Sequence, residues 1–209
     1  LAILLGFGSV GITISAFFFS LLTVALVYLI GQRAQGKRIL NLVLAGMVVS
    51  SLFTAGTSYI KLVADPTNQL PAITYWLMGS LSGVRMTKVL YIFPVMLLGL
   101  VPLFLLRWKI NLLTLGDEEA QAMGIHPVRL RFVIVICATL VTSASISVAG
   151  TIGWVGLVVP HLSRKLTGSN FKKLLPASML AGAVFLLLVD DLSRNLLATE
   201  IPIGILTAF

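Results

Sequence analysis

Charged residues are scarce in this chain of 209 residues. They make up 11% of it, against roughly a quarter in a soluble domain, while hydrophobic residues make up 58% and the mean hydropathy is +1.04. Acidic residues are rarer than basic ones: there are seven aspartates and glutamates against fifteen lysines and arginines. The basic residues stand in short clusters between apolar runs, as they do in membrane-protein loops. The net charge of +8 therefore points to membrane lipid and not to nucleic acid.

Cysteine and catalytic motifs are also missing. Cys137 is the single cysteine, which excludes an intrachain disulfide and favours a packing role. The sequence contains no GxxxxGK[ST], no HExxH and no paired carboxylates near a serine or cysteine. His126 and His161 have no further ligand at metal-site spacing. We therefore expect no enzyme activity, no metal site and no cofactor held by this chain.

What the chain does contain is a series of apolar runs. Spans are predicted at 11–30, 39–60, 88–106, 132–148 and 174–189, and another begins at 201. The runs 72–85 and 150–162 are short and rich in glycine, which favours half-helices. The predicted fold is an all-α polytopic transmembrane helical bundle with short half-helices, a single domain over 1–209. Residues 1–32 carry no charge and are too long for one span but too short for two, so we expect earlier spans and the end of the final helix to be missing.

The basic residues predict which side each loop occupies. The loops 31–38, 107–131 and 164–173 hold eleven lysines and arginines, whereas the other side holds four. The positive-inside rule places these three loops in the cytoplasm. This arrangement requires the segment 150–162 to cross back as a short or broken helix.

Residues 116–131, GDEEAQAMGIHPVRLR, form the longest polar stretch. Asp117 is a suitable N-cap, and Glu118 and Glu119 place negative charge in a first helical turn. Gly124 fits the C′ position of a helix end, and Pro127 suits the first turn of the next helix. The stretch is predicted to form two short helices with a sharp corner, the second running into a span. Ala120 and Met123 are expected on one face of the first helix. Cap chemistry alone favours a plain capped loop without a further role.

Five motifs follow one another along the chain: WLMGSL (76–81), LGDEEAQAMGI (115–125), GTIGWVGLVVPHLSR (150–164), RKLTGSNFKKLLP (164–176) and IPIGILTA (201–208). Their order and spacing resemble those of FecCD-type permeases of ABC importers. The segment EEAQAMG resembles the Glu-Ala-Ala signature of importer permeases. The resemblance covers essentially the whole chain, and Trp154 departs from it where phenylalanine is usual.

The resemblance implies a function and a set of partners. Such permeases import iron–siderophore complexes, haem, vitamin B12 or oxyanions, and they work as pairs beside two ATPases and a substrate-binding protein. ATP and Mg would bind to the ATPase subunits. The polar corner would be the coupling helices, cytoplasmic structures that contact the ATPase, with the candidate residues Asp117, Glu118, Glu119, Ala120, Met123, Gly124, His126 and Pro127. The expected location is a bacterial or archaeal cytoplasmic membrane.

The resemblance also suggests roles for residues elsewhere. The loop 31–41 resembles the region that closes the inner exit, so Lys37, Arg38 and Asn41 are candidate gate residues. Arg85 and Lys88 would lie at the outer mouth, where basic side chains could meet acids of the binding protein.

Glycines and ion pairs give further expectations. Gly150, Gly153 and Gly156 recur every three residues and would share a bare helix face, either for packing or for lining a pathway. Pro160 and His161 are expected to end that helix. Asp190, Asp191 and Arg194 are expected either to pair locally at helical spacing or to contact the docking face of the binding protein, with a role in a transport pathway as the alternative. The same expectation holds for Lys61 and Asp65.

Two other function classes remain open from the residues alone. An ion-driven secondary carrier would need ionisable groups in mid-membrane, and the predicted spans are nearly free of charge. A membrane scaffold without transport activity would need no ATPase partner. The sequence does not identify the cargo.

Overall fold

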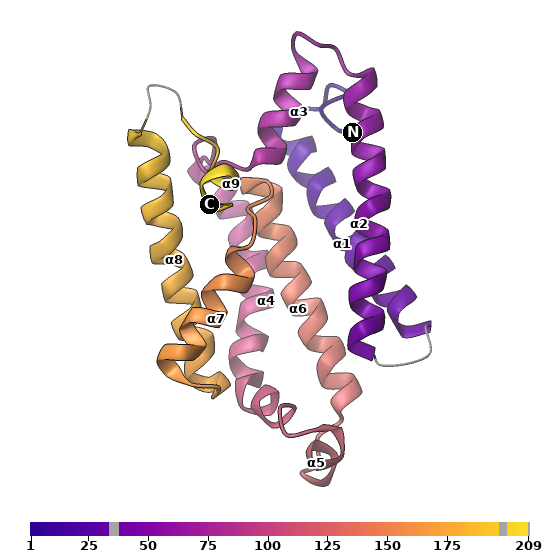
Figure 1. The fold of residues 1–209 in the computed structure, drawn as a ribbon, viewed down its shortest axis with the longest axis vertical. Coiled ribbons are helices and arrows are strands. Elements are labelled where there is room, and N and C mark those ends of the chain that lie inside the picture. Colours follow the sequence, from indigo (N-terminus) through magenta and orange to yellow (C-terminus); the bar gives the residue numbers. More distant parts are fainter. Residues whose placement is uncertain (34–37, 197–199, 209) are drawn as a thin grey trace.

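The computed structural model describes residues 1–33, 38–196 and 200–208. Within these ranges the chain folds into helices and turns without strands, which confirms the all-α prediction (Figure 1). The helices are α1 (Ser9–Arg33), α2 (Arg38–Val63), α3 (Gln69–Met78), α4 (Met86–Leu112), α5 (Asp117–Ala122), α6 (Pro127–Ala149), α7 (Val155–Thr167), α8 (Phe171–Asn195) and α9 (Ile203–Leu206).

Five of these helices, α1, α2, α4, α6 and α8, are long and apolar enough to cross a membrane. The five correspond to the five full spans predicted from the sequence. With 10 and 13 residues, α3 and α7 are shorter than the roughly 20 residues that a bilayer requires, which confirms the two predicted half-helices. The structure extends most spans beyond the predicted limits because polar residues also continue the helices. For example, α4 runs through Arg107 and Lys109 to Leu112 and continues through Pro94 and Pro102.

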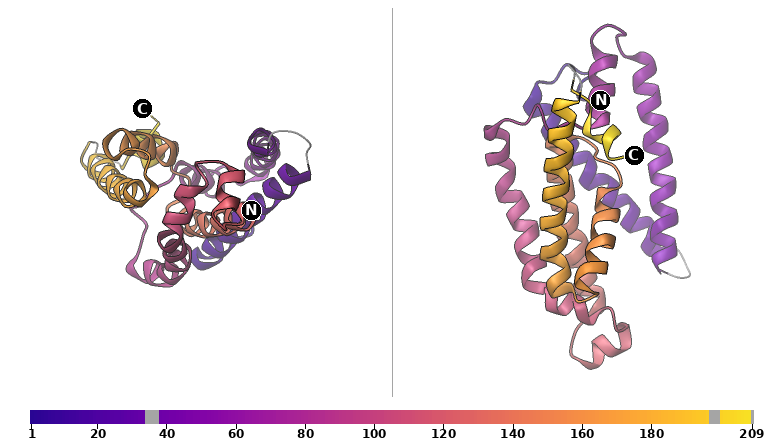
Figure 2. Two further views of the ribbon diagram at one scale, coloured as in Figure 1. Left: turned by 90° about the horizontal axis from the view of Figure 1, so that it is seen from below. Right: turned by 60° about the vertical axis from the view of Figure 1, so that its left-hand side comes forward.

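The helix α6 lies at the centre of the fold, packed between α1 and α4 (Figures 1 and 2). Seen from below in Figure 2, α7 and α8 form one side and α1 and α2 the other. Small residues allow the close approach that helices need in a membrane. A Cβ on Gly99 of α4 would lie 2.7 Å from the carbonyl oxygen of Cys137 in α6. The buried Ser143 of α6 shares a hydrogen bond of 2.8 Å with Ser20 of α1.

The basic segments predicted to share one side of the membrane do lie at one end of the molecule. The C-terminal end of α1, the helix α5 and the turn between α7 and α8 are all at the lower end in Figure 1. The helices α3 and α9 and the start of α4 lie at the upper end. Assignment of the lower end to the cytoplasm stays a prediction.

Candidate functional site

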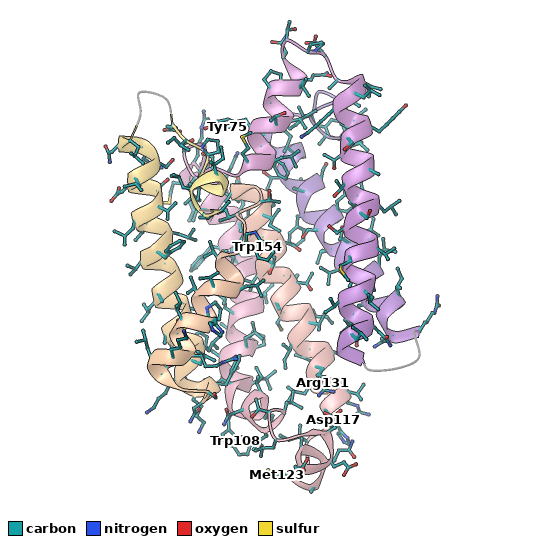
Figure 3. The ribbon with its side chains drawn as sticks, in the orientation of Figure 1. Tyr75, Trp108, Asp117, Met123, Arg131 and Trp154 are labelled. Carbon is teal, nitrogen blue, oxygen red and sulfur yellow. The ribbon has the colours of Figure 1, made fainter. Side chains whose placement is uncertain are left out.

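The corner between α4 and α6 projects beyond the bundle and carries the short helix α5 (Figure 3). Gly116, with a φ of 132°, occupies the N-cap position, and its carbonyl accepts from the N–H of Ala120 at 3.2 Å. Asp117 is therefore the first residue of the helix and not its cap, so the predicted N-cap is wrong by one residue. The reason is that its carboxylate is used elsewhere, by Arg131. The three acids in the first turn still face the positive end of the helix dipole, as predicted.

The end of α5 is a Schellman motif. The N–H of Gly124 donates to the carbonyl of Gln121 at 2.9 Å, and the N–H of Ile125 donates to that of Ala120 at 3.0 Å. Gly124 has a φ of 77°, the left-handed value predicted for it. The helix α6 then begins at Pro127, also as predicted. The second of the two predicted short helices is the start of α6 and is therefore continuous with that span.

A small apolar core fixes α5 to the bundle. It consists of Ala120, Ile125 and Leu130, all buried, with partly buried leucines of α4 and the segment after it packed against them. Ala120 is 0% exposed, whereas Met123 is 54% exposed. The expectation that these two residues present one common face is therefore wrong. Ala120 anchors the helix, and Met123 lies at its outer tip (Figure 3).

An ion pair joins α5 to α6 at a second point. Arg131 donates to both carboxylate oxygens of Asp117, at 2.8 and 2.6 Å, in the two-pronged geometry that arginine favours. Both side chains are about two-fifths to one-half exposed, so the pair contributes at most about 1 kcal/mol to stability. Figure 3 shows the two residues facing each other beside α5. Sequence reasoning missed this contact, because residues separated by a turn and a helix boundary follow no helical spacing rule.

The remaining candidate residues of the corner form its exposed surface. Glu118, Glu119 and His126 are exposed, and Pro127 is buried. Beside them lies a hollow of about 360 Å³ bordered by Trp108 and Lys109 of α4 and by Arg129 of α6. The corner thus presents acids on one flank, with an apolar hollow and basic side chains on the other. Such a surface suits contact with a protein partner more than chemistry on a small molecule.

The predicted gate residues lie at the same end of the molecule as α5. Lys37 is outside the described residues. Arg38 is the first residue of α2, and Asn41 lies half-buried in its first turn. The structure thus brings the start of α2 and the corner that carries α5 to the same end of the molecule.

The three regularly spaced glycines do not share a helix face, so that prediction is wrong. Gly150 ends α6 with a φ of 72°, Gly153 lies in the connecting loop, and Gly156 lies in the first turn of α7. The chain leaves the helix between the first and second of them, which breaks the periodicity. Pro160 and His161 do not end α7 either, because the helix continues to Thr167.

A different set of glycines makes the close backbone contacts. A Cβ on Gly150 would lie 2.5 Å from the carbonyl oxygen of Trp76, and one on Gly79 or Gly204 would collide with the carbonyl of Thr151 or Met78, respectively. Backbone hydrogen bonds join the same segments: Ser80 donates to Ala149, and Ile203 donates to Gly79. We call this meeting of α3, α6 and α9 the glycine junction. No local pattern predicts this junction, since the three glycines are far apart in the chain.

The charged residues of the upper end follow the predictions only in part. Asp190 and Arg194 form the predicted i, i+4 ion pair at 2.9 Å. Asp65 does not pair with Lys61, and that prediction is wrong. Its carboxylate instead accepts from the hydroxyl of Thr67 and from the backbone N–H of Asn68, which together fix the turn before α3. These hydrogen bonds, chiefly that from Thr67, hold the pKa of Asp65 below its ordinary value.

Arg85 and Lys88, the candidate docking residues, begin α4 at the same upper end. Arg85 is the exposed N-cap residue, and Lys88 is half-buried one turn later. Among the residues that the structure describes, no group of three His, Cys, Asp or Glu side chains could hold a metal ion.

Known proteins resemble this chain in both sequence and fold. The sequence profile of the FecCD transport family matches residues 1–209. The chain is 41% identical over 208 residues to the molybdate import system permease of Haemophilus influenzae. The match covers 100% of this chain and 62% of that protein. It is 43% identical over 197 residues to a protein of Helicobacter pylori described as an iron chelatin transport system permease. The match covers 94% of this chain and 60% of that protein.

The cobalamin import system permease of Halobacterium salinarum is 36% identical over 199 residues, which cover 95% of this chain and 53% of that protein. A solved metal-chelate type ABC transporter in an inward-facing conformation superposes with a TM-score of 0.92 at 41% identity, covering 99% of this chain and 66% of that one. The chain thus spans about three fifths of the length of the first curated relatives it matches. A full-length profile match, close relatives and a shared fold lead to one conclusion: the chain belongs to the FecCD transport family.

Proposed function

We propose that this protein is the membrane-spanning permease subunit of an ATP-driven importer, and that α5 is its contact with the ATPase. One observation carries the proposal: a short helix projects beyond the bundle and is fixed to it by a Schellman motif, a buried core and an ion pair. A loop without a mechanical task would not need three separate attachments. Because α6 starts three residues after Gly124, a push on α5 reaches a full span directly.

The cargo is a metal chelate or a related compound, since the named relatives handle molybdate, an iron chelate and cobalamin. The importer would combine two copies of the permease, two ATPase subunits that hold ATP and Mg, and a substrate-binding protein in the bacterial or archaeal cytoplasmic membrane. This chain would supply no catalytic group. Arg85 and Lys88 would meet acidic side chains of the binding protein at the outer mouth.

The proposal is tested by assembly and uptake. The ATPase encoded beside the permease should co-purify with it in detergent, and the reconstituted complex should take up cargo only with ATP. Met123→Asp should reduce retention of the ATPase because it places a charge on the exposed apolar tip of α5. Ser169→Asp, an exposed position in another turn at the same end, is the matched control and should retain the ATPase. Uptake without any ATPase would show a secondary carrier, and absence of both uptake and ATPase would show a scaffold.

A further inference from the structure

One hydrogen bond fixes the first turn of α8 to the end of α4. The first N–H groups of a helix have no acceptor within the helix and need partners elsewhere. Asn170, the N-cap of α8, accepts from the N–H groups of residues 172–174 through its side chain and its backbone carbonyl. The N–H of Phe171 donates instead to the side-chain carbonyl of Asn111, at 3.1 Å. This acceptor is 60 residues away in the sequence, so the bond joins two separate parts of the lower end.

Asn111 lies where the corner that carries α5 begins. It belongs to the last turn of α4, and its backbone carbonyl accepts from both the N–H and the hydroxyl of Thr114, which turns the chain out of the helix. The next two residues, Leu112 and Leu113, pack against the buried core that fixes α5. Asn111 itself is half-buried. One residue thus connects to the base of α5 through its neighbours in the chain and to α8 through its side chain.

The upper ends of α6 and α8 are also connected to each other. Ala149, the last residue of α6, accepts a hydrogen bond from Ser80 in the glycine junction. Ser193, near the end of α8, exchanges two hydrogen bonds with Ile201, which precedes Ile203 of the same junction by two residues. Both helices therefore run from the lower end to one connected region at the upper end (Figure 1).

Two helices that are joined at one end can still slide past each other at the other end. A movement of α5 reaches α6 directly, because α6 begins immediately after the corner. Without Asn111, the lower end of α8 would be held to the corner only by the packing of its side against α4, and packed helices can shift along each other. The hydrogen bond from Phe171 to Asn111 opposes this shift. One neutral hydrogen bond changes a conformational population by roughly twofold to tenfold.

We propose that Asn111 is a positioning residue, which makes α8 move together with α6 when the ATPase moves α5. The inference rests on the proposed function and adds a second span to the one that α5 reaches through α6. Asn111 acts by holding the N-terminus of α8 against the corner. An acceptor oxygen is what this position requires, and a carboxylate would also serve because the N-terminus of a helix favours negative charge.

Spin labels measure this joint movement without knowledge of the cargo. Val128→Cys in the first turn of α6 and Lys173→Cys in the first turn of α8 place labels at two exposed positions, in a Cys137→Ala background. The assembled complex would be diluted with unlabelled permease, so that only the distance within one chain is read. With Asn111 present, this distance should be the same with and without ATP. In Asn111→Ala it should shift or broaden by about 2 Å when ATP is added.

Asn170→Ala is the matched control. It removes one hydrogen bond from the same turn of α8 but leaves the bond to the corner, so the distance should stay independent of ATP. Asn111→Asp should also stay independent of ATP, because it keeps the acceptor oxygen. Asn111→Ser, whose side chain is too short to reach Phe171, replaces Asn111→Ala if the alanine variant does not assemble.

Three results would overturn the inference. They are an ATP-dependent shift with Asn111 in place, no shift in either Asn111→Ala or Asn111→Ser, and equal shifts in Asn111→Ala and Asn170→Ala, which would show an ordinary helix cap. ATPase retention is scored on the same preparations. Loss of the ATPase from the wild-type complex would overturn the proposed function as well, whereas any of the three results in a complex that retains its ATPase would overturn the role of Asn111 alone.

Discussion

Gly124 is the residue on which the aim of α5 depends. Its φ of 77° belongs to the left-handed region, and a Cβ there would meet no atom within 4 Å. A side chain would therefore fit in the space at this position, and only the left-handed backbone conformation disfavours a residue other than glycine. Gly124→Val should add roughly 1–2 kcal/mol of strain and re-aim α5 without disturbing the membrane bundle. We expect normal membrane insertion with reduced ATPase retention or with ATP hydrolysis uncoupled from uptake, measured together in proteoliposomes.

Gly124→Asn is the matched control, since asparagine tolerates the left-handed region better than other residues with a Cβ. It should stay close to wild type. Glu119→Ala, a change at an exposed acid of the same helix, should give a weaker form of the valine defect. Full and tightly coupled uptake by Gly124→Val would mean that the corner is only a capped loop.

The carboxylate of Asp65 stabilises the turn before α3 through hydrogen bonds that depend on its ionisation. Because hydrogen bonds from Thr67 and Asn68 lower its pKa below the ordinary 3.8, its stabilising effect is fully present above about pH 4 and is lost as the pH falls through the lowered value. Asp65→Ala should therefore speed deuterium uptake across the first turn of α3 at pH 7. The difference from wild type should shrink in strong acid. A difference that is independent of pH would argue against the carboxylate as its source.

Residue-level signals in the sequence succeeded where the cause was local. Gly124 and Pro127 were predicted correctly because a helix end and a helix start each depend on a few neighbouring residues. The cap position of Asp117 was wrong because a distant arginine competes for its carboxylate. Gly79 and Gly204 carried no local signal, since what requires a glycine there is a backbone from another segment.

At the scale of elements, the ion pair between Asp117 and Arg131 links α5 to the first turns of α6. Removal of either partner should lower stability by at most about 1 kcal/mol, because both side chains are substantially exposed. Its effect on coupling should be larger than its effect on stability, since the pair fixes the angle of α5. A double-mutant cycle with Asp117→Ala and Arg131→Ala would measure this in the ratio of cargo imported to ATP hydrolysed. Additive effects of the two changes would show that the pair does not act as a unit.

The start of α2 is the element predicted to narrow the inner exit. Asn41 lies in its first turn, at the same end as α5. If two copies of the permease face each other there, a disulfide between the two copies of Asn41→Cys should form at a yield that changes with nucleotide. The yield should be compared with and without ATP in a Cys137→Ala background. An unchanged yield would show that this connection is passive.

Element positions were predictable from the sequence because apolar length alone defines a span. The glycine-rich run 150–162 was predicted correctly as short, but its internal geometry was not. The glycine spacing suggested one continuous helix, whereas the chain turns sharply between Gly150 and Trp154 before α7 begins. Periodicity cannot reveal a break that is imposed by packing against α3 and α9.

At the scale of the whole molecule, charge predicts orientation. Ser169 lies in the turn between α7 and α8 at the lower end, and Thr67 lies before α3 at the upper end. Both are exposed. In a Cys137→Ala background, Thr67→Cys should react with a membrane-impermeant thiol reagent added to intact cells, and Ser169→Cys should not. The reverse pattern would invert the topology and place α5 outside the cell, away from any ATPase.

The arrangement of the helices in space could not be obtained from their order. That α6 lies between α1 and α4 depends on close contacts of small residues, such as that of Gly99 with the backbone of Cys137. Composition identifies such residues but not their partners. The apolar runs supplied the fold class, and the contacts themselves required coordinates.

The glycine junction also has a consequence for biosynthesis. The carbonyl of Gly79 receives its hydrogen bond from Ile203, which the ribosome adds long after α3 has been made. Until Ile203 is added, the carbonyl of Gly79 lacks this hydrogen bond. An unsatisfied carbonyl costs free energy in lipid unless water or a chaperone donates a hydrogen bond to it. Maturation of the upper end therefore comes last during synthesis, whereas the corner at α5 can close as soon as α6 emerges. Arrest of translation shortly before Ile203 should leave a nascent chain that is complete at the lower end and sensitive to membrane proteases at the upper end.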